Sequence, residues 1–398
     1  MRSSEIKAAH RDFRFLSSIV FIFWFVNALG SYLTIFLLKQ GYGPDQVGII
    51  YAYTSIVSIL STVFCGVIAD KIKSNRKIFI FCFFISAVFW AMIPVSSKVT
   101  PAPMVFILSI CLLHFFFKSP TYSLLDAFVV QRADQARLDF GRLRMWGSIS
   151  FAITSLLLSV ILPKTGVEIT FYLSSIAVIP LLVIMLKVKD TGKYTGHKSF
   201  RSMGIGRLFR NYNFITYLIY LLFFQMSMNA FGSFLPYLIN TVGGDPAQIG
   251  ILGGCVAMLE IPMLLLARRI KRKFPMSVIL SGAVIFFIIE AFLFSRADSF
   301  PQIIIIHTLY GIGSGLMIGM TSYIYSFVPG DLISTAYTMC GSVCGIAAII
   351  GNLAGGMLVT ALGIHTLYFI LGLVMLFTLC YFVTTLAAGT RIFGRALP

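Results

Sequence analysis

The chain has 398 residues, of which 58% are hydrophobic and only 11% are charged, and its mean hydropathy is +0.92. Soluble globular domains carry about 25% charged residues, so this composition excludes a water-soluble enzyme, a secreted disulfide scaffold and a disordered protein. A helical membrane span needs roughly 20 apolar residues. The sequence therefore predicts an all-α polytopic membrane protein.

Twelve apolar segments long enough to cross a bilayer follow one another along the chain. We expect transmembrane helices over residues 15–38, 47–69, 78–97, 103–131, 143–163, 168–187, 213–238, 248–267, 275–295, 302–327, 334–360 and 364–388. All seven cysteines fall inside these segments without metal-ligand spacing, which indicates packing residues rather than disulfides or a metal site. The short loops leave no room for a catalytic domain, so we expect no enzymatic activity.

The net charge of +17 follows the predicted topology. Of the 31 lysine and arginine residues, 26 fall at the termini and in alternate connections between spans. The opposite side has only Lys39, Lys98, Lys164 and Arg296. Basic residues gather on the cytoplasmic side, so we expect a multi-pass protein of the bacterial inner membrane with both termini in the cytoplasm. The loop near Asp331 lacks a basic residue and is an exception. The charge reflects orientation in the lipid bilayer, and no nucleic-acid partner is expected.

The longest polar stretch, residues 187–213, divides the chain near its middle. The sequence GPDQVGI before the second span resembles DPAQIGI before the eighth, and ADKIK after the second resembles ARRIK after the eighth. Duplicated halves of this kind are typical of transporters that bind substrate between them. We predict a six-helix bundle over residues 1–187, a cytoplasmic linker over 188–212 and a second six-helix bundle over 213–398.

The segment GVIADKIKSNRK, from Gly66 to Lys77, resembles the signature between the second and third spans of the major facilitator superfamily. The resemblance implies two pseudo-symmetric halves and a conformational latch at this loop. Gly66 would let two helices approach closely. Asp70 would cap a helix end and pair with a nearby base, for which Lys71 and Arg76 are candidates. The alternative is a basic cytoplasmic loop that contains glycine and aspartate by chance.

A narrower resemblance is to the lactose permease family, and within it to a phenylpropionate-permease-like branch. It rests on residues 48–77, on LDAF at 125–128 and on DFGRLRMWGS at 139–148. The family places a substrate-binding acid and arginine where Asp126 and Arg144 stand, and the branch has Glu and His where Glu260 and His307 stand.

The positions of Asp126 and Arg144 in the sequence predict how far each lies from the membrane surface. They lie nine residues either side of position 135, in the turn between two antiparallel spans, so both reach roughly 13 Å from that turn. They can pair or share a ligand, and a guanidinium offers a planar fork to hydroxyl or carboxylate oxygens. A purely structural ion pair is the alternative. Arg142 lies nearer the turn and is expected to be solvated.

Glu290 and His307 are related in the same way about the outer loop at residues 296–301, and we expect that they can meet. Histidine changes protonation near neutral pH, which suits proton coupling, although a lone histidine in a span is often a packing residue. Glu260 begins 12 residues inside its span, roughly 18 Å deep. A carboxyl group at that depth can carry a proton, so Glu260, His307 and Glu290 form the predicted coupling set.

Lys118 is the least expected charge within a span. It lies one helical turn from His114 and two turns from Asp126 on the same helix. It could neutralise Asp126 or Glu260, or select an anionic substrate, and the sequence leaves these alternatives open.

The sequence departs from lactose permease at several positions. Tyr310 stands where the family has its coupling acid, and a phenol does not release a proton near neutral pH. Phe151 stands where the family has a tryptophan that stacks on galactose, so a galactoside is not expected as substrate. Further candidates for the binding pocket are polar and aromatic residues of the first and seventh spans: Trp24, Asn27, Tyr32, Gln225, Asn229 and Tyr237.

These observations favour a monomeric secondary active transporter, a proton-coupled importer of a small solute such as an oligosaccharide, a nucleoside or an aromatic acid. A proton gradient would supply the energy, and no cofactor or metal is expected. An exporter of drugs or sugars on the same fold is the alternative. A non-transporting membrane receptor or enzyme is disfavoured, because the chain has no appended domain and no catalytic motif in a credible context.

Overall fold

The computed structural model describes residues 3–98, 103–136, 138, 140–187, 205–270, 272–317 and 320–393. Throughout these ranges the regular structure is helical. Two compact units are formed, unit 1 from residues 1–40 and 53–197 and unit 2 from residues 41–52 and 198–398. The all-α polytopic fold predicted from the sequence is confirmed.

Unit 1 contains the helices of the first six predicted spans. They are α1 (Ser3–Leu29), η1 (Gly30–Tyr32), α2 (Leu33–Lys39), the larger part of α3 (Pro44–Ile72), α4 (Asn75–Met92), η2 (Ile93–Lys98), α5 (Pro103–Gln135), α6 (Phe140–Thr165) and α7 (Glu168–Lys187). The first span is interrupted by the short 3-10 helix η1. The α3–α4 turn is tight, because Lys73 adopts a positive φ of 55° and the Ser74 hydroxyl accepts a hydrogen bond from the Lys77 amide at 3.2 Å.

Unit 2 contains the helices of the last six predicted spans. They are α8 (Ile205–Phe209), α9 (Tyr212–Ser233), α10 (Leu235–Thr241), η4 (Pro246–Gln248), α11 (Ile249–Ile270), α12 (Met276–Phe294), α13 (Phe300–Met317), α14 (Met320–Tyr325), η5 (Gly330–Leu332), α15 (Ile333–Leu362) and α16 (Ile364–Phe393). The seventh span breaks at Phe234, two residues before Pro236, whose nitrogen has no proton to donate to the helix. Asn211 caps α9 by accepting a hydrogen bond from the Phe214 amide.

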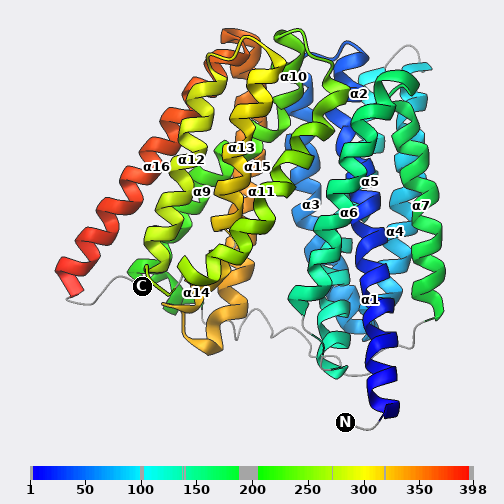
Figure 1. Cartoon of the computed structure of the whole chain (residues 1–398), viewed down its shortest axis with the longest axis horizontal. Coiled ribbons are helices and arrows are strands. Elements are labelled where there is room, and N and C mark those ends of the chain that lie inside the picture. Colours follow the sequence, from blue (N-terminus) through cyan, green and yellow to red (C-terminus); the bar gives the residue numbers. More distant parts are fainter. Residues whose placement is uncertain are drawn as a thin grey trace. The chain divides into compact units, whose positions relative to one another are not determined.

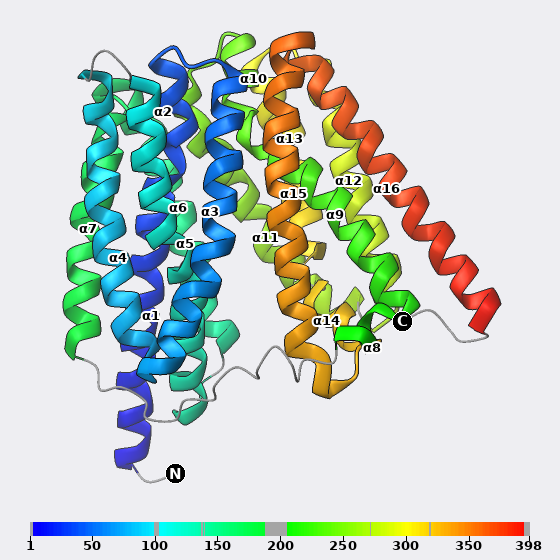
Figure 2. The ribbon, with the colours of Figure 1, turned by 180° about the vertical axis from the view of Figure 1, so that it is seen from behind.

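Four helix contacts recur at equivalent places in the two units. In unit 1, α1 packs against α6 and α7, and α4 packs against α5 and α7 (Figure 1). In unit 2, α9 packs against α15 and α16, and α12 packs against α13 and α16 (Figure 2). These four contacts relate spans at the same places in the two halves of the chain. The equivalence is what an internal duplication predicts.

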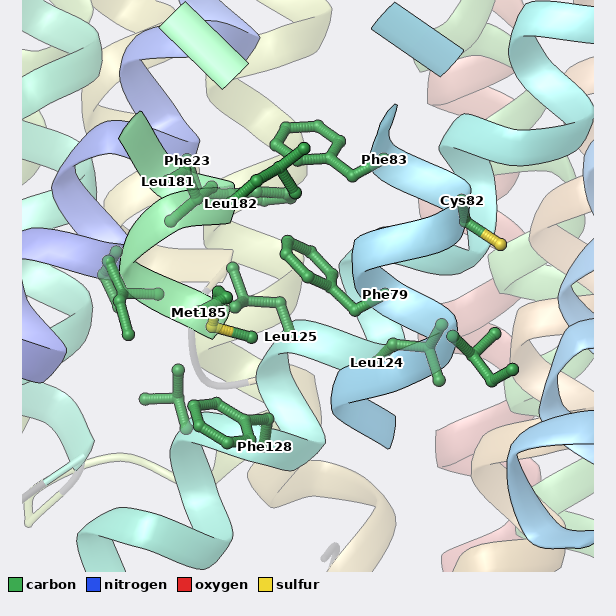
Figure 3. Packing of buried hydrophobic residues seen from close by; sticks show 14 of the residues in the cluster. Phe23, Phe79, Cys82, Phe83, Leu124, Leu125, Phe128, Leu181, Leu182 and Met185 are labelled. Atoms are coloured by element: carbon green, nitrogen blue, oxygen red, sulfur yellow. The ribbon is translucent and has the colours of Figure 1, made fainter. Parts of the chain in front are cut away.

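The core of unit 1 is built from aromatic and aliphatic side chains of α1, α4, α5 and α7. Figure 3 shows Phe23, Phe79 and Phe83 gathered with leucines of α5 and α7. The ring centroids of Phe79 and Phe83 are 5.2 Å apart, and that of Phe83 lies 5.5 Å from Phe23. Helices in a bilayer associate through close packing rather than through a hydrophobic gradient, so this cluster holds the four helices together.

Eleven helices of the described residues are long and apolar enough to cross a membrane, and the eighth predicted span contains a shorter apolar segment, Pro246–Glu260. Large apolar side chains such as Leu60, Val160 and Ile305 are more than 60% exposed. Lipid tails can cover such apolar surfaces, whereas a water-soluble protein rarely exposes so many large apolar side chains. The chain is a multi-pass membrane protein. The predicted division at the linker stays a prediction, and residues 188–204 lie outside the described ranges.

Candidate binding and coupling sites

Trp24 of α1 is the centre of an aromatic and basic surface in unit 1. The guanidinium carbon of Arg144 on α6 lies 5.0 Å from the centroid of the Trp24 ring, a cation–π arrangement. Phe151 and Tyr122 present their rings to Trp24 at 6.4 and 6.5 Å. A Cβ atom at Gly147 would lie 2.8 Å from the indole nitrogen, so only glycine leaves room for this tryptophan.

Asp126 and Arg144 do not form the ion pair that their equal depth allowed. Both side chains are exposed, and neither is within 4.0 Å of an opposite charge among the described residues. Equal depth fixes the height of a residue on its helix, but the rotation of α5 and α6 about their axes decides which way the side chains point. No close salt bridge joins the two side chains, and the guanidinium of Arg144 lies over the Trp24 ring.

Asn27 and Tyr122 connect α1 to α5. The Tyr122 hydroxyl donates a hydrogen bond to Asn27 Oδ1 at 2.5 Å, and the Asn27 amide donates to the carbonyl of Phe23 at 2.7 Å. Asn27 is buried. The buried amide thus has its donor and its acceptor engaged, and it fixes the position of the Tyr122 ring.

Lys118 lies in an aromatic cage rather than beside a carboxylate. Its Nζ atom lies 4.5 Å from the ring centroid of Phe83, 5.2 Å from that of Phe23 and 5.4 Å from that of Tyr122. Within unit 1 no described carboxylate neutralises it, so the proposed pairing with Asp126 is wrong. His114, one turn earlier, donates from Nδ1 to the carbonyl of Ser86 at 2.8 Å.

The side chains of His114 and Lys118 line a cavity of about 240 Å³ inside unit 1. Asn27, Tyr122 and Trp90 also line it. No sequence pattern marks Phe83, Ser86 or Trp90 as site residues, because they are apolar or small residues of the third span. Only the position of α4 beside α5 brings them to Lys118.

Glu290 of α12 and His307 of α13 meet as their spacing predicted. His307 Nδ1 lies 2.6 Å from Glu290 Oε1, and the two residues are 6% and 0% exposed. The second carboxylate oxygen, Oε2, has no hydrogen-bond partner in the described part of the chain. Phe294 stacks on the imidazole at 6.0 Å, and the Tyr310 ring lies 5.1 Å from it. The pair is therefore enclosed by aromatic rings.

The remaining unit 2 candidates are polar groups of α9 to α11. Asn229 donates to the carbonyl of Gln225 at 2.7 Å, and Gln225 donates to the sulfur of Cys344 at 3.6 Å. Both side chains are half-buried, as is Glu260 on α11. Tyr237 is different, because its hydroxyl donates to the carbonyl of Tyr42 at 2.8 Å and its side chain is buried. That contact makes Tyr237 a structural tie within unit 2.

The structure changes the expectations for two residues outside these clusters, Tyr32 and Gly66. Tyr32 is buried and its hydroxyl has no partner among the described residues, so it belongs to the packed interior. A Cβ atom at Gly66 would meet no other atom within 4 Å, so the close helix approach expected there is not seen among the described residues. In the same loop Lys71 is exposed, and Arg76 Nε is buried without a hydrogen-bond partner in the described ranges.

Comparisons with known proteins agree with this architecture. The model of the MFS_1 like family matches residues 15–370. The nucleoside permease NupG of Escherichia coli (strain K12) is 27% identical over 144 residues, which cover 35% of this chain and only 32% of NupG. The putative nucleoside transporter YegT of the same organism is 24% identical over 367 residues, which cover 86% of this chain and 83% of YegT. The crystal structure of NupG superposes with a TM-score of 0.78 at 18% identity, over 94% of this chain and 98% of NupG.

Proposed function

The chain belongs to the MFS_1 like family of the major facilitator superfamily, and we propose that it is a secondary active transporter whose substrate is a nucleoside or a closely similar solute. The relatives support this substrate class, because NupG is a nucleoside permease and YegT is a putative nucleoside transporter. The alignment with NupG spans about a third of that protein. The substrate is therefore a proposal for this chain.

The observation that carries the substrate class is the exposed Arg144 held over Trp24. A nucleoside combines a flat aromatic base with a ribose that carries hydroxyl groups. An aromatic side chain stacks on such a base, and a guanidinium and a nearby carboxylate, Asp126, suit hydroxyl groups. In unit 2, the amides of Gln225 and Asn229 offer further donors and acceptors. The unit 1 set of Trp24, Arg144 and Asp126 matches a polar aromatic solute better than a purely apolar one.

We propose that transport is coupled to protons through Glu290 and His307, with Glu260 as a further carrier. Glu290 and His307 share one short hydrogen bond, and Glu290 Oε2 has no partner among the described residues. A carboxyl–imidazole pair can hold one proton more or less without a change of geometry. Buried ionisable groups in a span commonly serve as proton relays. The proton gradient would then be the energy source, with no cofactor.

The remaining expectations from the sequence enter this proposal unchanged. Both termini would lie in the cytoplasm, as the distribution of basic residues predicts. The protein would work as a monomer in the lipid bilayer, with Asp70, Lys71 and Arg76 in the latch loop. The motif at residues 125–148 would reflect a distant similarity to the lactose permease and phenylpropionate permease branch.

Uptake by reconstituted protein tests the proposal. Purified protein in proteoliposomes should accumulate [³H]uridine above its external concentration when the interior is alkaline, and a protonophore should abolish the accumulation. Empty liposomes are the control. Accumulation only with an acidic interior would indicate an exporter. A complete lack of uridine exchange, with folded protein, would contradict the nucleoside class.

Glu260→Gln tests the further carrier in the same assay. Exchange of uridine should survive this change, because glutamine resembles the protonated acid, whereas accumulation driven by the pH gradient should be lost. Normal accumulation by Glu260→Gln would remove Glu260 from the coupling set.

A further inference from the structure

The cavity inside unit 1 holds a cation that neither the proposed nucleoside site nor the proposed coupling set uses. Lys118 is 9% exposed and lines the cavity. Three aromatic rings surround its ammonium group, and no described residue of unit 1 supplies a carboxylate or another hydrogen-bond acceptor to it. Ionisable groups within spans normally face a partner or a ligand. The three N–H bonds of Lys118 are therefore available to a ligand in the cavity.

Trp90 contributes its ring to the same cavity wall. It is 3% exposed, and its ring packs on His114 at 4.4 Å, while His114 is itself fixed by Ser86. The indole nitrogen is enclosed by protein atoms and does not face the cavity. Lys118 is therefore the cationic donor that this wall presents to a ligand.

The other polar groups of the wall are already engaged. Ser119 donates to Ser58 at 2.6 Å, and Ser58 donates to the carbonyl of Thr54. Asn27 accepts from Tyr122, and Ser31 donates to the carbonyl of Asn27. The Lys118 ammonium group, left without an acceptor in unit 1, points to a ligand that accepts hydrogen bonds and carries a negative charge.

The volume of the cavity and its apolar wall residues restrict the kind of ligand that it can bind. A volume of about 240 Å³ is too large for a bare inorganic ion, and it lies below the roughly 300–1,000 Å³ of pockets for drug-sized ligands. Val26, Phe83, Phe115 and Val178 give the cavity apolar walls. We propose that this cavity binds a small organic anion, one carboxylate on an apolar or aromatic body of about one ring. The carboxylate contacts Lys118, and the body packs on the apolar wall.

This site goes beyond the proposed transport of nucleosides, because its wall includes neither Trp24, Arg144 and Asp126 nor the coupling pair. Its ligand differs from a nucleoside in charge and in size. Failure of nucleoside transport would leave the binding measurement below unaffected.

Equilibrium binding of [¹⁴C]benzoate to the purified full-length protein tests the proposal. Wild-type protein should bind benzoate saturably, and unlabelled benzoate should compete. Benzyl alcohol has a similar shape without the charge and should not compete. Lys118→Met keeps the length of the side chain without its charge and should weaken binding at least tenfold. Lys164→Gln removes an exposed positive charge at the end of α6 and should leave binding unchanged.

Lys118→Gln provides a second variant, because it keeps a polar side chain that can donate a hydrogen bond and removes only the charge. It should weaken benzoate binding at least threefold, and it decides the matter if Lys118→Met does not fold. Equal binding by wild type and both variants would overturn the proposal. Competition by chloride as strong as that by benzoate, or by benzyl alcohol as strong as that by benzoate, would also overturn it.

Discussion

The Nδ1 atom of His307 lies 2.6 Å from the Oε1 atom of Glu290, in a site where the glutamate is fully buried. The two residues come from consecutive helices, α12 and α13, and meet near the middle of unit 2's aromatic core. Burying ionisable groups in hydrocarbon costs several kcal/mol if they lose their partner. A transporter can use such a pair to carry a proton, and the first prediction tests that role.

Glu290→Gln should uncouple transport from the proton gradient. Glutamine preserves the volume and a hydrogen bond to His307, but it cannot ionise. Uridine exchange across proteoliposomes should therefore persist, while accumulation driven by a pH gradient should fall at least tenfold. Glu168→Gln, at the first turn of α7, is the matched control and should behave as wild type. Full accumulation by Glu290→Gln would mean that the pair is only structural.

Arg144→Lys should weaken uridine binding at least tenfold without unfolding the protein. Lysine keeps the charge but lacks the planar guanidinium that lies over Trp24. Asp126→Asn should have a similar effect, because it removes a charged acceptor of hydroxyl groups. Binding is measured by equilibrium dialysis, and melting temperature reports folding. Arg142→Lys, on the same helix and also exposed, should bind normally. Near-normal binding by Arg144→Lys would exclude Arg144 from the substrate site.

Gly147→Ala should destabilise the protein and weaken uridine binding together. The new methyl group would overlap the Trp24 indole, which must move away from Arg144. Overpacking of this kind costs roughly 1–3 kcal/mol. Gly66→Ala is the control, because a methyl group there meets nothing within 4 Å and alanine favours the helix by about 0.5–1 kcal/mol. A melting temperature for Gly147→Ala equal to that of wild type would contradict the packing described here.

Gly351→Ala should lower the melting temperature by disturbing the contact of α9 and α15. A Cβ atom at Gly351 would overlap the backbone carbonyl of Met226, and backbone cannot rotate aside as a side chain does. Gly341→Ala, on the same helix α15, meets open space and should be neutral or slightly stabilising. If both variants melt alike, the close approach of α9 and α15 is not needed for stability.

His197→Cys should resist labelling from outside intact cells if the connection between the two halves is cytoplasmic. The variant needs the Cys380→Ser background, because Cys380 is an exposed native thiol. An impermeant maleimide should label position 197 only after the membrane is permeabilised. Labelling of intact cells at this position would reverse the proposed orientation of both termini.

The sequence by itself determined the number and order of the spans, since hydrocarbon admits only long apolar helices in this composition. It also determined the meeting of Glu290 and His307. These residues flank one short loop at equal distance, and the two helices joined by that loop run side by side. Equal depth, which the rise per residue fixes, made this meeting possible.

Only the tertiary structure decided which side chains face one another around the helix axes. Asp126 and Arg144 have equal depth and yet do not pair within the described residues. Lys118 meets Phe23 and Phe83, which lie on helices that the chain reaches 95 and 35 residues earlier, and neither ring is distinguished in the sequence from the 38 phenylalanines of the chain. The rotation of each helix about its own axis is set by packing against several neighbours at once. That information is spread over the whole unit, so no local pattern of residues contains it.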